Sequence, residues 1–425
     1  MKRLNLFIFS LLLLISALSQ AQTTKEEVFK DITQAGGIYK SYSYTPTPGT
    51  PAPKGYQPFY ISHYGRHGSR WLDPESYYTI PNTILKEAHQ NKKLTEFGES
   101  LYTRIQVIAK DAEARYGALS PRGVREHKEI AERMFRSFPE VFSTANGRKC
   151  FIYSRSTTVP RCIISMAANN ERLKELNPEI EIQREAYDRN TYLNNRNKNK
   201  TSEKDSITAQ YTRFFYKHFD SNRFIAKVFN DTDYAKKQVS DPYTFISNIY
   251  SINADLQDID YLNVSLADVF TNDELFALWQ TINLRMYYYC GPSAAYGTDA
   301  INSAKLLLKN ILEGADQAIQ NGKVSADLRF GHDVFIIPLL ALMDVKGMNG
   351  READPEKVYQ VWSDFKVSPM GVNLQLVFFR NNQTKDILVK ILHCEKEVTI
   401  PVKTDIAPYY HWKDFKAYYE QKLAK

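Results

Sequence analysis

Three residues whose side chains could bind an anion and attack it lie close together in the sequence: Arg66, His67 and Arg70. In a packed core, the two guanidinium groups would need a partner for every donor, whereas in a turn they can grip a tetrahedral oxyanion. Gly65 and Gly68 would let the backbone approach that anion closely. A neutral imidazole is a good nucleophile near its own pKa. The pattern therefore predicts phosphoryl transfer through a phosphohistidine on His67, with the arginines stabilising charge on the transferring group.

The surrounding residues are typical of a strand that leads into a turn. Phe59, Tyr60 and Ile61 follow a run rich in proline and glycine, and we expect a strand that breaks at Gly65 and Gly68. A solvated basic turn with a packed histidine is the alternative, and it is the usual explanation of a lone histidine. The flanking arginines and the glycine break favour the anion site.

The segment Arg66-His67-Gly68-Ser69-Arg70 resembles the Arg-His-Gly-x-Arg signature of the histidine phosphatase superfamily. Its two-arginine form resembles the acid phosphatase branch, which includes phytases and multiple inositol polyphosphate phosphatases. That branch often carries a proline two residues after the second arginine, where this chain has Trp71-Leu72. The resemblance implies an α/β core around a mostly parallel sheet, a helical cap, and site residues at the carboxyl ends of strands.

A helix is expected to begin after Ser120, because serine is a good N-cap and Pro121 fits the first helical position. The segment from Leu119 to His127 resembles Leu-Thr-x-x-Gly-x-x-x-His in the same acid phosphatases. We expect this helix to run to about Phe138 and His127 to be structural within it.

A second strand is expected over residues 150–154, followed by a loop and a helix, with Arg155 and Arg161 in the loop. Such a unit can aim donors from the loop and the helix start at an anion. The loop resembles the family's Arg-Ser-Thr-x-x-x-Arg segment, in which an arginine joins the phosphate site. We predict Arg161 as the third phosphate-binding arginine. Arg155 is the alternative, or a residue that supports the site from behind, and ordinary solvation at a helix end is the simpler explanation of both.

The order of strand, glycine and helix recurs where Gly331 precedes His332-Asp333. A helix N-cap is the simplest explanation of Asp333 alone. Together with the first motif, the pair resembles the family's His-Asp proton-donor motif, which implies that His332 binds phosphate and Asp333 protonates the leaving oxygen. A bound phosphate and partial burial would raise the pKa of Asp333 enough for a general acid, so we expect activity to favour mildly acidic pH. Multiple inositol polyphosphate phosphatases often carry His-Ala-Glu here, a difference from this chain.

The expected fold class is α/β, with a mostly parallel sheet in a three-layer core and an inserted helical cap. Helical periodicity dominates the middle of the chain, where apolar residues recur on one face of several segments. The predicted division is a signal peptide over residues 1–21, an N-terminal leader over 22–58, the first part of the α/β core over 59–189, a mainly helical insertion over 190–322 and the second part of the core over 323–425.

The first residues are typical of a secretory signal peptide. Lys2 and Arg3 precede an apolar run, and Ser19-Gln20-Ala21 is a suitable cleavage site. The run is too short for a convincing membrane span, so we expect a secreted or periplasmic protein without a membrane partner after cleavage. The formal charge of +7 falls by two, to +5, when Lys2 and Arg3 leave. This mild positive charge suits a small anionic substrate and is too small to indicate nucleic acid binding.

The cysteines leave the disulfide pattern open. Four cysteines allow three pairings, and free buried thiols are equally compatible with the sequence. Their spacing fits no zinc pattern, and we expect no metal and no other cofactor. The residues are Cys150, Cys162, Cys290 and Cys394.

Taken together, the motifs predict a secreted, metal-independent phosphomonoesterase, which by resemblance acts on inositol polyphosphates such as phytate. A phosphoglycerate mutase-like phosphotransferase is one alternative, disfavoured by the second arginine, the export signal and the large insertion. A catalytically inactive protein that binds phosphorylated ligands is another, disfavoured because a binder needs neither His67 nor Asp333. We expect the protein to be a monomer.

Overall fold

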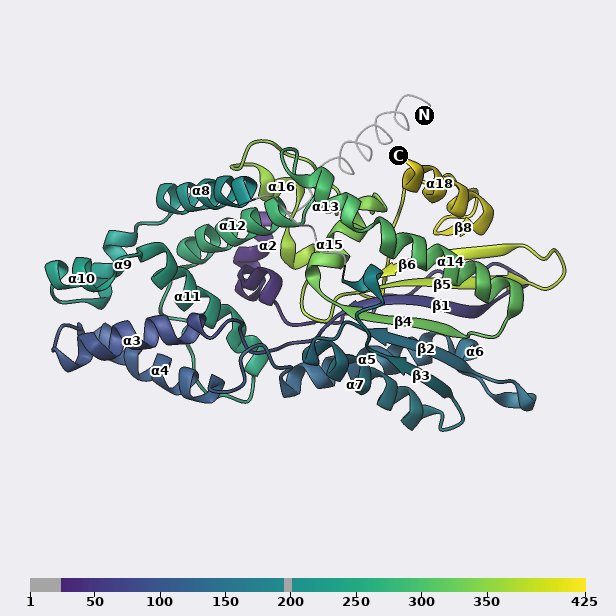
Figure 1. The fold of residues 1–425 in the computed structure, drawn as a ribbon, viewed down its shortest axis with the longest axis horizontal. Coiled ribbons are helices and arrows are strands. Elements are labelled where there is room, and N and C mark those ends of the chain that lie inside the picture. Colours follow the sequence, from purple (N-terminus) through teal and green to yellow (C-terminus); the bar gives the residue numbers. More distant parts are fainter. Residues whose placement is uncertain (1–23, 195–200) are drawn as a thin grey trace, which may run out of the picture.

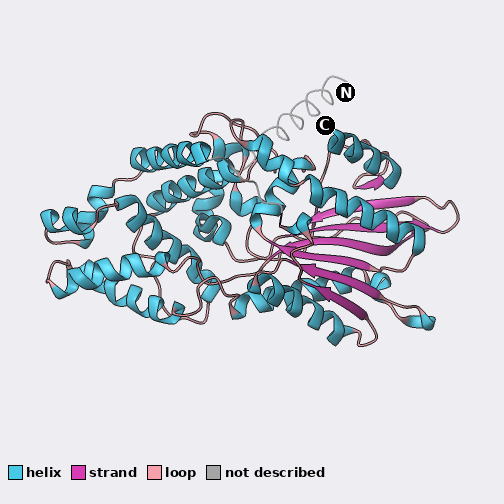
Figure 2. Ribbon diagram, viewed as in Figure 1, coloured by secondary structure: helices cyan, strands magenta, loops and turns pink. Residues whose placement is uncertain are grey.

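The computed structural model describes residues 24–194 and 201–425, and eight strands in these ranges form one mixed sheet (Figures 1 and 2). The strand order is β3-β2-β4-β1-β5-β6-β7, and β8 pairs with β6. Neighbours from β3 to β1 are parallel, whereas the pairs from β1 to β8 are antiparallel. The strands are β1 (Tyr56–Arg66), β2 (Phe151–Ser156), β3 (Glu181–Glu185), β4 (Ala326–Gly331), β5 (Asn373–Asn381), β6 (Ile387–His393), β7 (Lys396–Glu397) and β8 (Tyr409–His411).

Helices cover both faces of the sheet, so the core has three layers (Figure 1). In that view α5, α6 and α7 lie below the sheet, and α14 and α18 lie above it. This arrangement confirms the predicted α/β class, with the parallel strands β3, β2, β4 and β1 forming one half of the sheet. The bounds are α5 (Pro121–Ser137), α6 (Pro139–Phe142), α7 (Pro160–Leu176), α14 (Lys305–Asn321), α15 (Asp333–Leu342) and α18 (Trp412–Ala424).

A second group of helices lies beside the sheet, on the left of Figure 1, and contains no strand among the described residues. It is assembled from two separate stretches of chain, because α3 packs against α11 and α4 against α9. Its members are α3 (Ser76–Gln90), α4 (Glu96–Ala112), α8 (Thr201–His218), α9 (Ser221–Val228), α10 (Thr232–Gln238), α11 (Pro242–Asp255) and α12 (Asn272–Tyr289).

This division differs from the predicted one at two places. Residues 76–112 lie with the helical group, and α14 lies against β1 and α18 instead of in the cap. Apolar residues of α14 recur at helical spacing, and Leu308, Ile311 and Leu312 are buried. Periodicity alone cannot say which surface such a helix covers, so the sequence could not separate a cap helix from a core helix.

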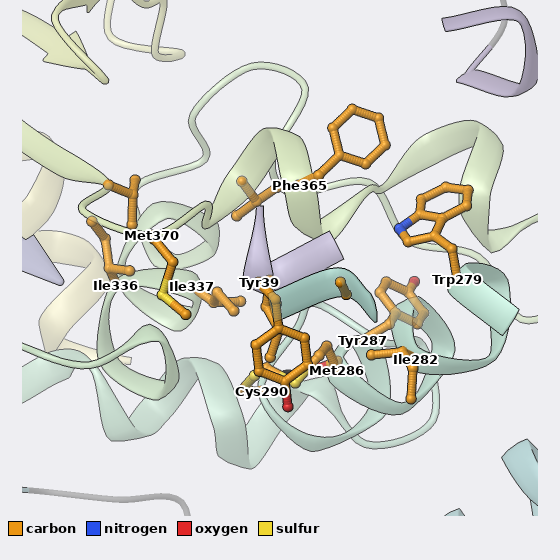
Figure 3. Packing of buried hydrophobic residues seen from close by; sticks show 14 of the residues in the cluster. Tyr39, Trp279, Ile282, Met286, Tyr287, Cys290, Ile336, Ile337, Phe365 and Met370 are labelled. Atoms are coloured by element: carbon orange, nitrogen blue, oxygen red, sulfur yellow. Dashed lines mark hydrogen bonds between the residues drawn. The ribbon is translucent and has the colours of Figure 1, made fainter. Parts of the chain in front are cut away.

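The short elements connect these layers, and η1 brings the N-terminal segment to the middle of the molecule. In Figure 3, Tyr39 of η1 lies among buried residues of α12, α15 and α17, including Met286, Ile337 and Phe365. Full burial of one such side chain contributes about 1.5–3 kcal/mol to the free energy of folding. The cluster therefore stabilises the packing of the helical group against the rest of the protein. The remaining elements are α2 (Thr24–Lys30), η1 (Ile32–Tyr39), η2 (Ala145–Gly147), η3 (Thr191–Leu193), η4 (Leu256–Ile259), α13 (Gly297–Ser303), α16 (Val358–Val361) and α17 (Asp364–Val367).

The first strand is longer than the sequence predicts. It continues through Gly65, which pairs with Phe330 on β4, and it ends at Arg66. Gly65 is needed for space, because a Cβ atom there would lie 2.8 Å from the ring of His63. The turn therefore begins only at His67, and Arg66 is held by the sheet instead of by a loop.

Several local predictions can be read directly from the structure. Ser120 is the N-cap of α5, and its hydroxyl accepts from the N–H of Gly123. All four cysteines are free. The predicted signal peptide lies outside the described residues, and none of the helices within them combines the length and apolarity that a membrane span requires.

Candidate active site

The predicted site residues meet where three parallel strands end. Arg66 ends β1, His332 follows β4, and Arg161 lies in the first turn of the helix after β2. Backbone hydrogen bonds hold the strand ends together: the N–H of His67 donates to Gly331 O at 2.9 Å, and that of Thr157 donates to Phe330 O at 3.1 Å. Carboxyl ends of parallel strands are the usual place for ligands in open α/β sheets.

His67 is held as a neutral imidazole with one free nitrogen. Its Nδ1 lies 2.9 Å from the carbonyl oxygen of Gly68, which can only accept, so Nδ1 carries the proton. Nε2 then keeps its lone pair. Burial, followed by Arg66 and Arg70, lowers the pKa of His67 well below its ordinary value. The ring is therefore unprotonated at neutral and mildly acidic pH, as a nucleophile must be.

Arg66 is fully buried and its position is fixed by the backbone of two other segments. Its Nη1 donates to Ile38 O at 2.7 Å and to Ser368 O at 2.8 Å. Its Nη2 lies 2.9 Å from a carboxylate oxygen of Asp333. The η1 segment therefore contributes to the site by holding this guanidinium, a role that no motif in the sequence indicated.

Three arginines present unsatisfied donors at the site. Among the described residues, the buried Nε atoms of Arg66, Arg70 and Arg161 have no hydrogen-bond partner. Arg70 is anchored through Nη1, 2.8 Å from Trp71 O, and lies 5.8 Å from the ring centre of Tyr39. Burial, and then Arg70, lowers the pKa of Arg161, which shows that positive charge is crowded here. Buried donors without partners need an explanation, and an anion held by all three would supply it.

His332 and Asp333 stand at the start of α15. The rings of His67 and His332 are 5.5 Å apart and nearly perpendicular. Burial alone raises the pKa of Asp333, but Arg66, His332 and Arg70 outweigh it, and the net pKa lies below the ordinary value. Without a bound anion, Asp333 is therefore ionised and paired with Arg66.

Arg155 lies in a different cluster. Its guanidinium forms an ion pair with Asp327 and donates to the hydroxyl of Tyr192 at 2.9 Å. Arg329, which aligns with Arg155 in the sheet, is 4.0 Å from the same Asp327. These contacts hold Nη1 and Nη2 of Arg155, whereas its Nε has no hydrogen-bond partner among the described residues. Arg161 is among the charges that lower the pKa of His67 and Arg155 is not, so the arrangement favours Arg161 as the third arginine of the site.

Two residues beside His332 were missed by the sequence reasoning. The hydroxyl of Tyr64 accepts from the His332 N–H at 3.1 Å and lies 3.3 Å from its carbonyl oxygen. Thr157 Oγ1 is 3.3 Å from His332 Nε2. Tyr64 was detectable as the residue two positions before Arg66 in the same strand, and Thr157 as the threonine of the second motif. Tyr64 contacts the backbone of His332 and Thr157 its ring, so both help to fix the position of this histidine.

Neither a protein-family model nor a curated protein sequence matches this chain. Solved structures do match its fold. The Bifidobacterium longum multiple inositol polyphosphate phosphatase in complex with inositol hexasulfate has a TM-score of 0.76 and 18% sequence identity, and the match covers 89% of this chain and 96% of that one.

Phytases match over similar lengths. The phytase from D. castellii has a TM-score of 0.65 and 14% identity, covering 92% of this chain and 85% of that one. The Hafnia alvei phytase has a TM-score of 0.54 and 13% identity, covering 88% and 98%. The chain therefore has the fold of a multiple inositol polyphosphate phosphatase and of phytases, the fold that its resemblance to histidine acid phosphatases implied.

Proposed function

We propose that this protein is a phosphomonoesterase that works through a phosphohistidine on His67. The observation that carries the proposal is the state of His67: a neutral ring with Nε2 free, next to arginines whose donors lack partners. A structural histidine would not need that charge around it. Arg66, Arg70, Arg161 and His332 orient the phosphate, and Asp333 is the general acid.

In the first step, Nε2 of His67 attacks phosphorus and the bond from phosphorus to the ester oxygen breaks. Asp333 gives its proton to the leaving alcohol. The dianionic phosphate competes with Asp333 for Arg66 and adds negative charge beside it, so the pKa of Asp333 rises when substrate binds. Asp333 thus changes from the ionised partner of Arg66 to the acid that the reaction needs.

In the second step, water attacks the phosphohistidine and the bond from phosphorus to Nε2 breaks. The Asp333 carboxylate takes a proton from the water and becomes the acid again. His67 returns to its starting form, and inorganic phosphate leaves the site. The guanidinium groups of Arg66, Arg70 and Arg161 supply the positive charge that stabilises the transferring phosphoryl group. We therefore propose that turnover requires no metal ion.

Inositol polyphosphates are the substrate class that we propose. Support comes from the fold shared with phytases and from the neighbour solved with inositol hexasulfate, a polyanion of the same shape. The mild positive charge of the chain also suits such a ligand. We also propose export, from the sequence of residues 1–21.

The test is phosphate release from p-nitrophenyl phosphate and phytate, with EDTA present, from mildly acidic to neutral pH. Wild-type protein should release phosphate from both, and the chelator should not slow it. His67→Ala, which removes the nucleophile, should release none. Equal turnover by this variant and the wild type would refute the mechanism, and the ratio of the two substrates measures the preference for inositol phosphates.

A further inference from the structure

Three buried carboxylates lie behind the phosphate-binding turn, and the mechanism above uses none of them. Glu126 comes from α5, Asp255 from α11 and Asp258 from η4. All three are almost fully buried. Glu126 and Asp258 contact Ser69, which lies between His67 and Arg70 in the turn, and Asp255 lies beside Asp258. Buried carboxylates need partners or protons, so the position of each hydrogen in this cluster can be worked out.

The hydroxyl of Ser69 makes two short contacts with carboxylates. Its Oγ is 2.7 Å from Oε1 of Glu126 and 2.7 Å from Oδ1 of Asp258. A serine hydroxyl has one hydrogen to donate, and two oxygen atoms this close need a hydrogen between them. One of the two contacts is therefore donated by a carboxylic acid.

Burial raises the pKa of Glu126, but the donors around it favour Glu126 over Asp258 as the ionised member. It accepts from the N–H of Ser69 at 2.8 Å and from the N–H of Tyr42 at 3.0 Å, and Arg122 is 3.5 Å away. Each of its oxygens thus already faces a backbone donor, which leaves little room for a proton. An anionic carboxylate is the best acceptor for such a set.

Asp258 has the opposite environment. Among the described residues, its Oδ2 has no hydrogen-bond donor and its Oδ1 faces Ser69, and its carboxyl group also lies beside that of Asp255. Burial first, and then Asp255 and Glu126, raises the pKa of Asp258 well above its ordinary value. The positive groups near it, Arg70 and Arg66, face it from the turn and the end of β1.

We propose that Asp258 is a neutral carboxylic acid that donates a hydrogen bond to Ser69 Oγ, and that this bond positions Arg70 for phosphate binding. Ser69 then donates its own hydrogen bond to Glu126. These two hydrogen bonds, here called the clamp, hold the turn between the helical group and α5. The turn also packs tightly against α5, because a Cβ atom on Gly68 would lie 2.6 Å from the carbonyl oxygen of Gly123. Asp258 and Ser69 are positioning residues in this scheme.

The proposal predicts opposite effects for the amide substitutions of Asp258 and Glu126. Asp258→Asn keeps the shape and offers an N–H to Ser69, so it should preserve the clamp. Glu126→Gln is the matched control: its amide turns a donor toward the N–H of Ser69 or of Tyr42, so it should break the clamp. Asp258→Ala removes the bond, and a displacement of about 1 Å at a binding group lowers kcat/KM by up to about 100-fold.

The kinetic test measures KM and kcat for p-nitrophenyl phosphate in all three variants, with circular dichroism to confirm folding. We expect Asp258→Asn to recover most of the activity that Asp258→Ala loses, and Glu126→Gln to raise KM more than Asp258→Asn does. The reverse order, with Asp258→Asn as damaged as Asp258→Ala and Glu126→Gln tolerated, would place the proton on Glu126 and overturn the proposal.

An infrared measurement tests the same point without any activity, so it stands apart from the proposed function. The difference spectrum of wild type minus Asp258→Asn at neutral pH should contain the C=O stretch of a protonated carboxyl group. A difference spectrum with a carboxylate band in its place would contradict the proposal even if the enzyme hydrolyses phosphate esters. If Asp258→Ala fails to fold, the infrared measurement and the comparison of Asp258→Asn with Glu126→Gln still decide whether Asp258 carries the proton.

Discussion

Nη2 of Arg66 lies 2.9 Å from Oδ2 of Asp333, so the last residue of β1 and the first residue of α15 form an ion pair across the candidate site. The pair explains how one aspartate can serve two roles. It neutralises Arg66 while the site holds no anion, and in the proposed mechanism it becomes the acid when phosphate takes its place on the guanidinium.

Replacing Asp333 by Asn removes the proposed acid and keeps its shape. We expect kcat to fall by roughly 10²–10⁴-fold for alkyl phosphates, whose alkoxide leaving groups need a proton. p-Nitrophenyl phosphate has a good leaving group and should be slowed far less. Steady-state kinetics with both substrates measures the difference, and an equal loss on the two would argue against acid catalysis by Asp333.

Arg161 and Arg155 form a matched pair, because both were candidates for the phosphate site and the structure separates them. Arg161→Ala should raise KM by roughly 10- to 100-fold, since a hydrogen bond to a charged group contributes about 1.5–3 kcal/mol, with little change in melting temperature. Arg155→Ala should destabilise the fold by about 1.5–3 kcal/mol, because it removes the nearer of the two arginines beside the buried Asp327 and leaves Arg329 at 4.0 Å.

Phosphate inhibition constants and thermal melts of the two variants provide the comparison. A larger effect of Arg155→Ala on phosphate affinity, with a normal melt, would restore Arg155 as the third arginine.

Two buried histidines under the sheet predict how stability depends on pH. Burial lowers the pKa of His63 to about 3 and that of His127 to about 4, below the ordinary 6.5. The unfolded chain therefore binds more protons than the folded one below pH 6.5, and stability falls as pH falls through this window. At pH 5 each histidine should cost about 2 kcal/mol relative to pH 7.5.

Urea unfolding at pH 7.5 and pH 5 tests this, with His127→Leu as the comparison. The variant keeps an apolar contact with Phe330, whose ring centre is 5.7 Å from that of His127. Its loss of stability on acidification should be about 2 kcal/mol smaller than that of the wild type. An unchanged pH dependence would mean that the pKa of His127 is the same in the folded and the unfolded chain, and it would contradict the effect of burial.

Where a motif is local, the sequence predicts which residues lie close together in the candidate site. Arg66, His67 and Arg70 lie within five residues, and Arg161, His332 and Asp333 each follow a recognisable strand, so their convergence follows from parallel-strand geometry. The anion-free state of Asp333 also follows from chemistry, because an aspartate beside arginines ionises.

The rest depends on contacts between distant segments. Ile38 reaches Arg66 from 28 residues away, and Asp258 reaches Ser69 from 189 residues away. No local pattern marks either one. Likewise, the apolar face of α14 is visible in the sequence, but the sheet that it covers is not. The His332-Asp333 motif differs from the His-Ala-Glu that multiple inositol polyphosphate phosphatases often carry, and one of these phosphatases shares the fold of this chain.

The central claim is covalent transfer to His67, and the most direct measurement is to trap the intermediate. Wild-type protein and His67→Ala are mixed with ³²P-labelled substrate, quenched in alkali within the first turnovers, and digested for peptide mapping. The account predicts an alkali-stable, acid-labile label on the peptide that contains His67, formed as fast as alcohol is released, and no label on the variant. Rapid hydrolysis by the wild type with no label, or label on another residue, would contradict it.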